Sequence, residues 1–215
     1  MVRRLASASL AFLVAGLVAT PSIADPVFEV MGAHTDNPEV LMPIMDVAPG
    51  SQFDVVVLLN SEDSPSAAAE FVLTELHLVL PGVFRLATET PAGTPIHLSI
   101  DPPGEYILAF RGCQPASSDF ELLRASYGAF GAAIPPDTVI ELRGLLPGDS
   151  VVSSFGGHPG IADCEDNRFA GRMGGHPGGY SDSGVVFPDG SLALNMTMPV
   201  VPAETHSWSS LKSRY

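Results

Sequence analysis

Short apolar runs bounded by turn residues dominate the chain from residue 27 to residue 198. The run 53–60, FDVVVLLN, is the strongest of them, and it follows the turn sequence APGS at 48–51. Runs of this kind, rich in Val, Ile, Phe and Tyr and separated by Gly, Pro, Asn and Asp, are typical of β-strands. Runs of this kind lie at 27–31, 53–60, 69–80, 83–88, 95–100, 105–111, 120–129, 138–146, 151–155, 184–187 and 191–198, and most of them are expected to be strands.

Two turn sequences predict hairpins within this order of strands. DPPG at 101–104 lies between the runs 95–100 and 105–111, and PDG at 188–190 lies between the last two runs. Proline fixes its own dihedral angle and Asp-Gly favours a tight turn, so both sequences are expected to reverse the chain. The run 69–80 is expected to be one long or bent strand, whereas 120–129 also fits a short helix.

The near-regular spacing of the runs predicts an all-β protein. About nine or ten strands fit an antiparallel β-sandwich, that is, two packed antiparallel sheets. A closed barrel is the alternative, because strand number alone does not separate the two architectures. A chain of this length can bury one substantial core, so one domain is sufficient.

The N-terminal residues have the three parts of a cleavable signal peptide. Arg3 and Arg4 supply positive charge, 5–20 is almost purely apolar, and Ser22 and Ala24 are small residues near the expected cleavage point. The apolar run is shorter than the roughly 20 residues that span a bilayer, which argues against a membrane anchor. We therefore expect a signal peptide at 1–24, a β-sandwich domain at 25–198, and a linker with a C-terminal tail at 199–215.

Charge limits the partners that the chain can bind. The full chain carries 24 Asp and Glu against 10 Lys and Arg, a formal net charge of −14. Without residues 1–24, which contain two of the basic residues, the net charge is −16. Nucleic acids and anionic membranes bind through positive charge, so neither is an expected partner. We expect a secreted, periplasmic or cell-surface protein with an unknown protein or glycan partner and no membrane span in the mature chain.

The chain has two cysteines, Cys113 and Cys164. In an exported protein an even number of cysteines indicates a disulfide bond. The alternative is a pair of thiolate metal ligands, which would need further ligands that the sequence does not identify. The sequence therefore predicts a bond between Cys113 and Cys164.

The pentapeptide GGHPG occurs twice, at 156–160 and at 174–178. Its histidines, His158 and His176, form with Asp163 a candidate site for a divalent metal, because imidazole and carboxylate groups are ligands for zinc and copper. The surrounding Gly and Pro residues are instead typical of a solvated loop, which would have to become ordered before it bound a metal. We expect the solvated loop and no bound cofactor.

The sequence assigns no catalytic residue. It contains no GxSxG or HExxH sequence and no glycine-rich phosphate loop. The paired carboxylates of glycosidases are defined by a distance and cannot be recognised from sequence. The first hypothesis is therefore an exported binding or structural module of unknown ligand. The alternative is a metal-dependent or carbohydrate-active enzyme that uses the loop 156–184.

The order of several segments resembles a loose group of exported bacterial β-sandwich proteins without an established activity. The resemblance rests on MGAHTD at 31–36, VVLLN at 56–60, SAAAEFVL at 66–73, Cys113 after a strand, and Asp163-Cys164 before the last strands. It covers most of the mature chain and implies a cohesin-like or immunoglobulin-like shape. Modules of that shape bind rather than catalyse, although a fold by itself does not supply a function.

The C-terminal residues predict a tail outside the sandwich. PVVP at 199–202 reads as an extended linker, because proline cannot donate to a sheet ladder. A short helix beyond it would place Trp208, Leu211 and Tyr215 on one face, with Lys212 near its C-terminal end. The ending also resembles a Trp/Lys/Tyr tail of the same group of proteins, which implies a role in attachment. A frayed C-terminus is the alternative.

Overall fold

The computed structural model of this chain describes residues 25–61, 65–91, 93–98, 104–115, 120–131, 133–149, 155–174, 177–180 and 184–197. The predicted signal peptide at 1–24 and the predicted linker and tail at 199–215 lie outside these residues. The proposed tail contacts Trp208, Leu211, Lys212 and Tyr215 therefore stay predictions.

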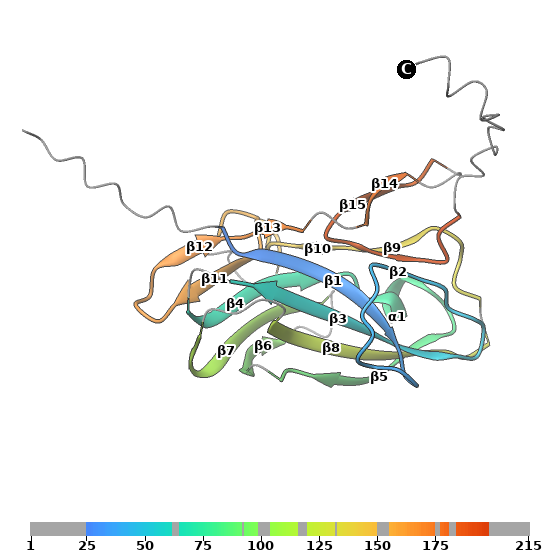
Figure 1. The fold of residues 1–215 in the computed structure, drawn as a ribbon, viewed down its shortest axis with the longest axis horizontal. Helices are drawn as coiled ribbons and strands as arrows, with labels where there is room; N and C mark the ends of the chain where they lie inside the picture. The colour runs from blue at the N-terminus through green and yellow to red at the C-terminus, as the bar shows by residue number, and fades with distance from the viewer. Residues whose placement is uncertain are drawn as a thin grey trace, which may run out of the picture.

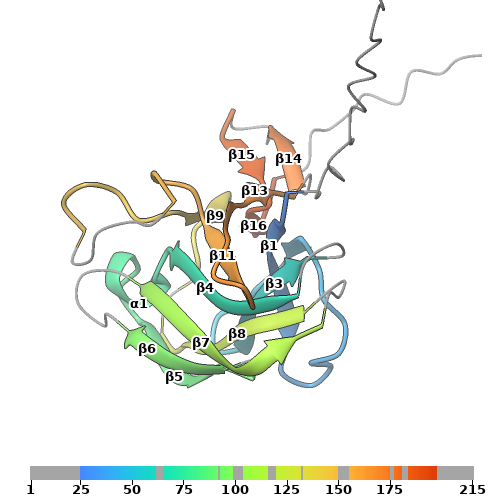
Figure 2. The ribbon, with the colours of Figure 1, turned by 90° about the vertical axis from the view of Figure 1, so that its left-hand side faces the viewer.

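Two β-sheets packed face to face form the main body of the molecule (Figures 1 and 2). The first sheet has the strand order β13 (Arg172–Met173), β1 (Val27–His34), β3 (Gln52–Asn60), β8 (Phe120–Ala129) and β5 (Val83–Glu89). The second has the order β12 (Arg168–Ala170), β11 (Gly160–Asp163), β4 (Ser66–Leu73), β7 (Glu105–Gln114) and β6 (Gly93–Leu98), with β10 (Leu142–Arg143) paired to β4. The predicted all-β sandwich is confirmed.

Smaller elements complete the described fold. One short helix, α1 (Leu76–Val79), connects β4 to β5. A three-stranded sheet consists of β2 (Ile44–Met45), β16 (Leu192–Leu194) and β9 (Thr138–Ile140), and β14 (Pro177–Tyr180) pairs with β15 (Val186–Asp189). The described residues thus form sixteen strands instead of nine or ten, and two of the pairs, β1 with β13 and β2 with β16, are parallel. The additional strands have two to four residues, which is too short for a periodic signal.

The hydrophobic core lies between the two main sheets. On β3 every second side chain from Phe53 to Leu59 belongs to this core. Within each sheet, aromatic rings of neighbouring strands stack on one another in this core. In the second sheet, Phe71 on β4 stacks on Tyr106 of β7, with ring centroids 5.1 Å apart. Phe53 stacks on Tyr127 of β8 at 5.8 Å. Such contacts add directional packing to the burial of large apolar surfaces.

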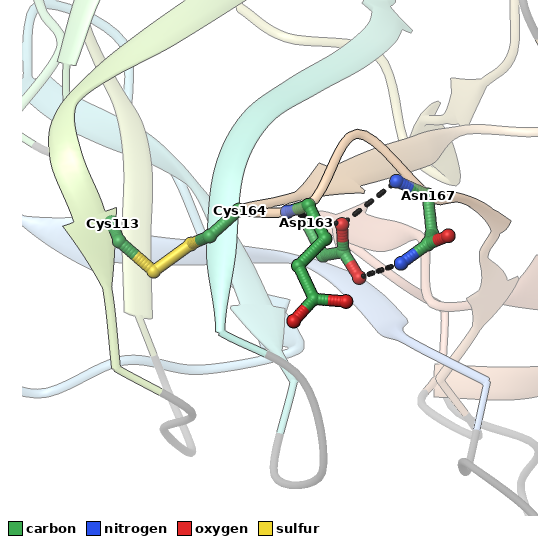
Figure 3. The surroundings of a disulfide bond; sticks show 5 residues. Cys113, Asp163, Cys164 and Asn167 are labelled. Carbon is green, nitrogen blue, oxygen red and sulfur yellow. Dashed lines mark hydrogen bonds between the residues drawn. A yellow bond between two sulfur atoms is a disulfide. The ribbon is translucent and has the colours of Figure 1, made fainter.

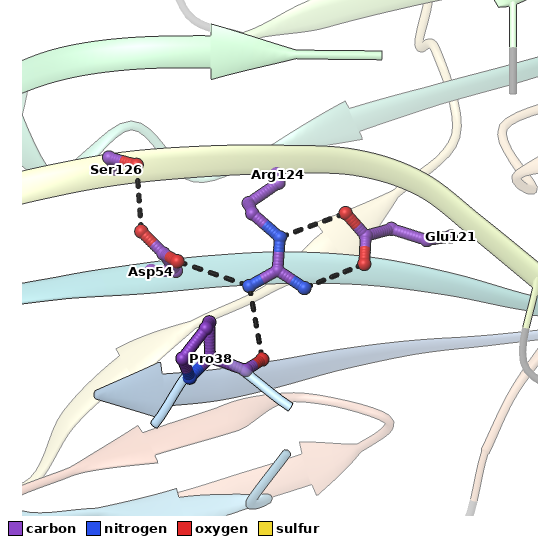
Figure 4. Close-up of polar contacts among 5 residues, drawn as sticks. All are labelled: Pro38, Asp54, Glu121, Arg124 and Ser126. Atoms are coloured by element: carbon purple, nitrogen blue, oxygen red, sulfur yellow. Dashed lines mark hydrogen bonds and ion pairs between the residues drawn. The ribbon is translucent and has the colours of Figure 1, made fainter. Parts of the chain in front are cut away.

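A polar cluster fixes the outer face of β3 and β8 (Figure 4). Arg124 on β8 donates hydrogen bonds to both carboxylate oxygens of Glu121 (2.9 and 2.7 Å) and to Oδ2 of Asp54 on β3 (3.1 Å). Ser126 donates to the other oxygen of Asp54 at 2.7 Å. Arg124 also donates to the carbonyl oxygen of Pro38 (3.3 Å), which holds the loop after β1 against this face. The buried carboxylate of Asp54 is thereby paired, as its desolvation requires.

The prediction of one strand over 69–80 was wrong. β4 ends at Leu73, and the chain turns through Thr74 and Glu75 into α1. The N–H of Thr74 donates to the carbonyl of Glu141 at 2.9 Å, which continues the pairing of β4 with β10 by one residue before the turn. The apolar run continues past the turn, so periodicity alone did not reveal it. The reason for the turn is Glu75, whose carboxylate is bound by side chains of other strands.

The two predicted hairpins have different outcomes. β6 and β7 form an antiparallel pair, which confirms the first. The second, at 188–190, was wrong, because β15 pairs with β14 while β16 pairs with β2 and β9. Ser191 does close a turn on the carbonyl of Pro188 at 3.2 Å. The carbonyl of Gly190, however, accepts a hydrogen bond from the N–H of Val30 on β1 (2.8 Å), which holds the turn against β1.

The segment 156–184 is not the plain loop expected from its Gly and Pro residues. Its described part contains β11, β12, β13 and β14. β11 pairs with β4 and extends the second sheet, while β13 pairs with β1 and extends the first. Gly160 on β11 leaves room for the ring of Phe155, which occupies the space that a Cβ would take. Glycine here allows close packing of strands and rings rather than free motion.

Candidate functional site

Glu75 is a buried acid at the start of α1. Only 2% of its surface is exposed. Its neighbours come from both sheets, since Arg85 lies on β5 and Tyr127 on β8 of the first sheet, and Tyr106 lies on β7 of the second. Glu75 therefore joins the two layers at the end of the sandwich that α1 covers.

The carboxylate of Glu75 accepts three hydrogen bonds from these neighbours. The hydroxyl of Tyr106 and Nη1 of Arg85 donate to Oε1, at 2.7 and 2.5 Å. The hydroxyl of Tyr127 donates to Oε2 at 2.7 Å. Nη2 of Arg85 donates in turn to the hydroxyl oxygen of Tyr106 at 2.6 Å. Nδ1 of His77 lies 3.3 Å from Oε2. Such a fully engaged carboxylate is a structural anchor, because its oxygens are committed to side chains that hold α1 on both sheets.

Two tyrosine rings and the guanidinium group of Arg85 surround the carboxylate of Glu75. The guanidinium carbon of Arg85 lies 5.8 Å from the ring centroid of Tyr106 and 6.0 Å from that of Tyr127. Burial first, and the Glu75 carboxylate second, raise the pKa of both tyrosines above their ordinary value. Gly104 has a φ of +50° and allows the main chain to approach here, because a Cβ at this position would overlap the carbonyl of Leu73.

We expect the free energy of unfolding to fall as the pH rises above about 10, the ordinary pKa of tyrosine. Tyr106 and Tyr127 have raised pKa values in the folded state, so their contribution to stability is complete below about pH 10 and is lost above it. Each tyrosine should cost about 1.4 kcal/mol per pH unit in that range. Urea unfolding at a series of alkaline pH values measures the slope.

The control for this prediction is Tyr106→Phe, which should remove about half of the slope because one of the two buried tyrosines can no longer ionise. The chain contains a single lysine, Lys212, so tyrosines dominate its titration in this range. An unfolding free energy that stays constant to about pH 11.5 would contradict the burial of the two hydroxyls.

β5 carries exposed apolar side chains beside this buried network. It is the last strand of the first sheet, and among the described residues only β8 pairs with it. Val83 and Arg85 point inward, whereas Phe84 and Leu86 are 53% and 46% exposed. Phe130, just after β8, is 43% exposed, and its ring stacks on Phe84 with centroids 6.5 Å apart. We call Phe84, Leu86 and Phe130 the β5 surface.

An open hollow of about 620 Å³ accompanies β5. It is lined by all residues of the range 83–88, by 80–82 and by His77. Successive side chains of a strand point to opposite faces, so a hollow that touches every residue of 83–88 follows the edge of the strand. Nε of Arg85 is buried in this region and has no hydrogen-bond acceptor among the described residues.

The predicted metal site is not assembled by the described residues. His158 is exposed in the turn before β11, and His176 lies outside the described residues. The carboxylate of Asp163 is occupied by the side-chain amide of Asn167 (2.7 Å) and by the N–H groups of Asn167 and Glu165, both at 2.8 Å (Figure 3). These hydrogen bonds, the Asn167 side chain foremost, lower the pKa of Asp163. In the described part of the chain no three His, Cys, Asp or Glu residues are grouped to hold a metal, and the site at His158, His176 and Asp163 stays a prediction.

The disulfide between Cys113 and Cys164 is confirmed, with Cα atoms 5.6 Å apart (Figure 3). Cys113 is near the end of β7 and Cys164 directly follows β11, and these two strands flank β4. Ser66, the first residue of β4, pairs with Gln114 on one side and Asp163 on the other. The bond thus joins the two neighbours of β4 where β4 begins. A disulfide bond fits an oxidising compartment.

The Glu75 network and the β5 surface were not predicted from the sequence. A signal for the network was present, because Glu75 and Arg85 are each a lone charge inside an apolar run. A charge in such a run must find a partner when the run is buried. No comparable signal marks the β5 surface, since Phe84 and Leu86 are ordinary strand residues until the position of β5 at the sheet edge is known.

Comparison with known proteins gives structural similarity only. No protein-family model matches the chain, and no curated protein matches it. Among solved structures it is similar to the sixth cohesin of Acetivibrio cellulolyticus scaffoldin B, solved with a Cel5 dockerin, at 13% identity and a TM-score of 0.44, over 79% of this chain and 99% of that one.

Two further cohesins show the same degree of similarity. The seventh type I cohesin of Pseudobacteroides cellulosolvens ScaB has 13% identity and a TM-score of 0.43, over 81% of this chain and 96% of that one. The cohesin module of a family 33 glycoside hydrolase of Clostridium perfringens has 10% identity and a TM-score of 0.40, over 68% of this chain and 90% of that one.

In the described residues no helix has the length and apolar character needed to cross a membrane.

Proposed function

We propose that this chain is an exported binding module that docks a partner protein on the β5 surface. The observation that carries the proposal is the exposure of three large apolar side chains, Phe84, Leu86 and Phe130, together at the edge of one sheet. Apolar side chains that are exposed as a group, with aromatic residues among them, are typical of sites of protein association.

The support beneath the β5 surface suits a binding site. Arg85 lies between Phe84 and Leu86 in sequence, and its guanidinium is fixed inside the sandwich by Glu75 and Tyr106. The exposed side chains are therefore presented by a strand that is held from below. A rigid surface loses less conformational entropy when a partner binds, which strengthens binding.

Export is the second part of the proposal. The disulfide requires an oxidising compartment, and residues 1–24 have the composition of a signal peptide. We propose that these residues are removed, that 25–198 is the binding domain, and that 199–215 is a linker and tail. The net charge of −16 for the mature chain keeps such a module soluble and disfavours nucleic acid as its partner.

Replacing Phe84 and Leu86 together by serine should weaken partner binding strongly and leave the fold intact. Each side chain is more than two-fifths exposed, so its loss removes little core packing. A central apolar contact of an interface contributes about 1 to 2 kcal/mol or more, so the double variant should raise the dissociation constant by about 100-fold. The measurement is capture of extracellular proteins of the native cell by the immobilised chain, followed by calorimetric titration of the captured protein.

Val186→Ser is the matched control. Val186 is 56% exposed on β15, outside the β5 surface, so its substitution should leave binding unchanged. A genuine partner binds the wild-type chain and the Val186→Ser variant but not the double variant. A partner that binds all three proteins with equal affinity would contradict the proposed surface.

A further inference from the structure

We propose that the partner contributes an extended, positively charged segment that adds as a new strand to the free edge of β5. This inference rests on the proposed function and specifies how the β5 surface is used. Addition of a strand to a sheet edge obtains affinity from main-chain hydrogen bonds and specificity from pockets for alternate side chains.

The hydrogen-bond ladder shows which main-chain groups of β5 face away from β8. Ala129 exchanges hydrogen bonds with Gly50 (2.7 Å) and Ser51 (3.0 Å), on the β3 side of β8. Successive residues of an antiparallel ladder direct their main-chain groups to opposite sides. Tyr127 therefore also faces β3, and its partner on β5, Arg85, directs its main-chain N–H and C=O toward the free side.

Beyond a bulge in β5, main-chain groups again face away from β8. The register with β8 shifts between Arg85 and Ala87, so Leu86 is the extra residue of the bulge. After it, Thr88 pairs with Ala125, which has the same orientation on β8 as Tyr127. Thr88 accordingly directs its N–H and C=O toward the free side as well. The main-chain groups of Arg85 and Thr88 are thus available at the edge that the hollow follows.

The net charge of the chain and the bulge in β5 together indicate which kind of partner segment can bind. The net charge of −14 for the full chain repels a second copy and attracts a segment that contains Lys or Arg. A bulge bends and twists an edge strand, which hinders pairing with another rigid edge. An extended segment that is free before binding can follow the twist. The occupant is therefore a flexible basic segment with alternating apolar side chains that meet Phe84 and Leu86.

The test uses displayed random peptides of about ten residues, the length of a long strand, as the probe. Peptides are selected on the mature chain, synthesised, and titrated against two variants of one position. Thr88→Pro removes the outward N–H and retains strand-compatible dihedral angles, while Thr88→Ala retains the N–H. Enrichment of Lys or Arg with alternating apolar residues is expected. The dissociation constant should rise about tenfold for Thr88→Pro and stay within about twofold for Thr88→Ala.

The outcomes separate this inference from the proposed function. Equal affinity for Thr88→Pro and Thr88→Ala, with binding lost in the Phe84→Ser/Leu86→Ser variant, overturns strand addition and leaves the β5 surface as the site. Undiminished affinity for the Phe84→Ser/Leu86→Ser variant overturns both. If light scattering finds a dimer of the mature chain and Thr88→Pro dissociates it, a second copy is the occupant and the basic segment is overturned. The absence of any selected peptide also overturns the basic segment. Thermal unfolding verifies that each variant is folded.

Discussion

Replacing Glu75 by alanine is expected to lower the free energy of unfolding by about 3 to 5 kcal/mol. The substitution removes the acceptor of three buried hydrogen bonds at once. Arg85 would be left as a mostly buried charge without a counter-ion, and Tyr106 and Tyr127 would each lose the partner of a buried hydroxyl. Removal of one member of a buried ion pair is costly because the other member stays desolvated.

Equilibrium unfolding in urea measures this effect, and two variants control for it. Glu75→Gln keeps the shape and one acceptor oxygen but removes the charge, so its destabilisation should lie between that of wild type and Glu75→Ala. Glu165→Ala removes an exposed acid from the turn after β11 and should change stability by less than about 0.5 kcal/mol. A loss below about 1 kcal/mol for Glu75→Ala would show that α1 does not depend on the buried network.

Replacing both cysteines by serine is expected to lower the free energy of unfolding by about 4 kcal/mol. The bond closes a loop with a sequence separation of 51 between Cys113 and Cys164. Without it the unfolded chain gains the conformational freedom of that loop, whereas the folded strands keep their pairing with β4. Urea unfolding of the Cys113→Ser/Cys164→Ser variant measures the difference.

Chemical reduction of the wild-type chain is the control for the double substitution. Both cysteines are exposed, so a reductant reaches them in the folded protein. Titration of the denatured, unreduced wild-type chain should find no free thiol, and the reduced chain should match the stability of the serine variant. Equal stability of the oxidised and reduced chains would mean that the loop is already restrained in the unfolded state.

The sequence predicts best those strands in which core-facing and outward-facing residues alternate over the whole element. β3, β7 and β8 have nine or ten residues, and one face of each contributes to the core, so period and structure agree. The disulfide was also predictable, because a predicted signal peptide and an even number of cysteines leave few alternatives. Each of these features depends on local sequence or on composition.

The features that sequence did not predict depend on contacts between distant residues. β11 is short and begins with a glycine, and it is a strand because β4 offers it an edge. The turn at Glu75 depends on Arg85, Tyr106 and Tyr127, which belong to three other strands. The β5 surface depends on which strand ends the sheet. Sheet order is a property of the whole chain, and local periodicity does not contain it.

The pairing of the first strand with the last segments of the domain determines the order in which the chain can fold. β1 has β3 on one side and β13 on the other, and Val27 pairs with Arg172. The carbonyl of Gly190, still later in the chain, accepts from Val30. A chain that emerges with its N-terminus first therefore leaves one side of β1 without its neighbour until these residues have appeared.

Such long-range contacts are entropically costly to form, because the entropy of large loops is lost before the contacts are made. An incomplete chain would present β1 as an open edge able to pair with other chains. The second edge of β1 is closed only when Arg172, Met173 and Gly190 have been synthesised. The topology thus makes the last contacts of the first strand depend on completion of the chain.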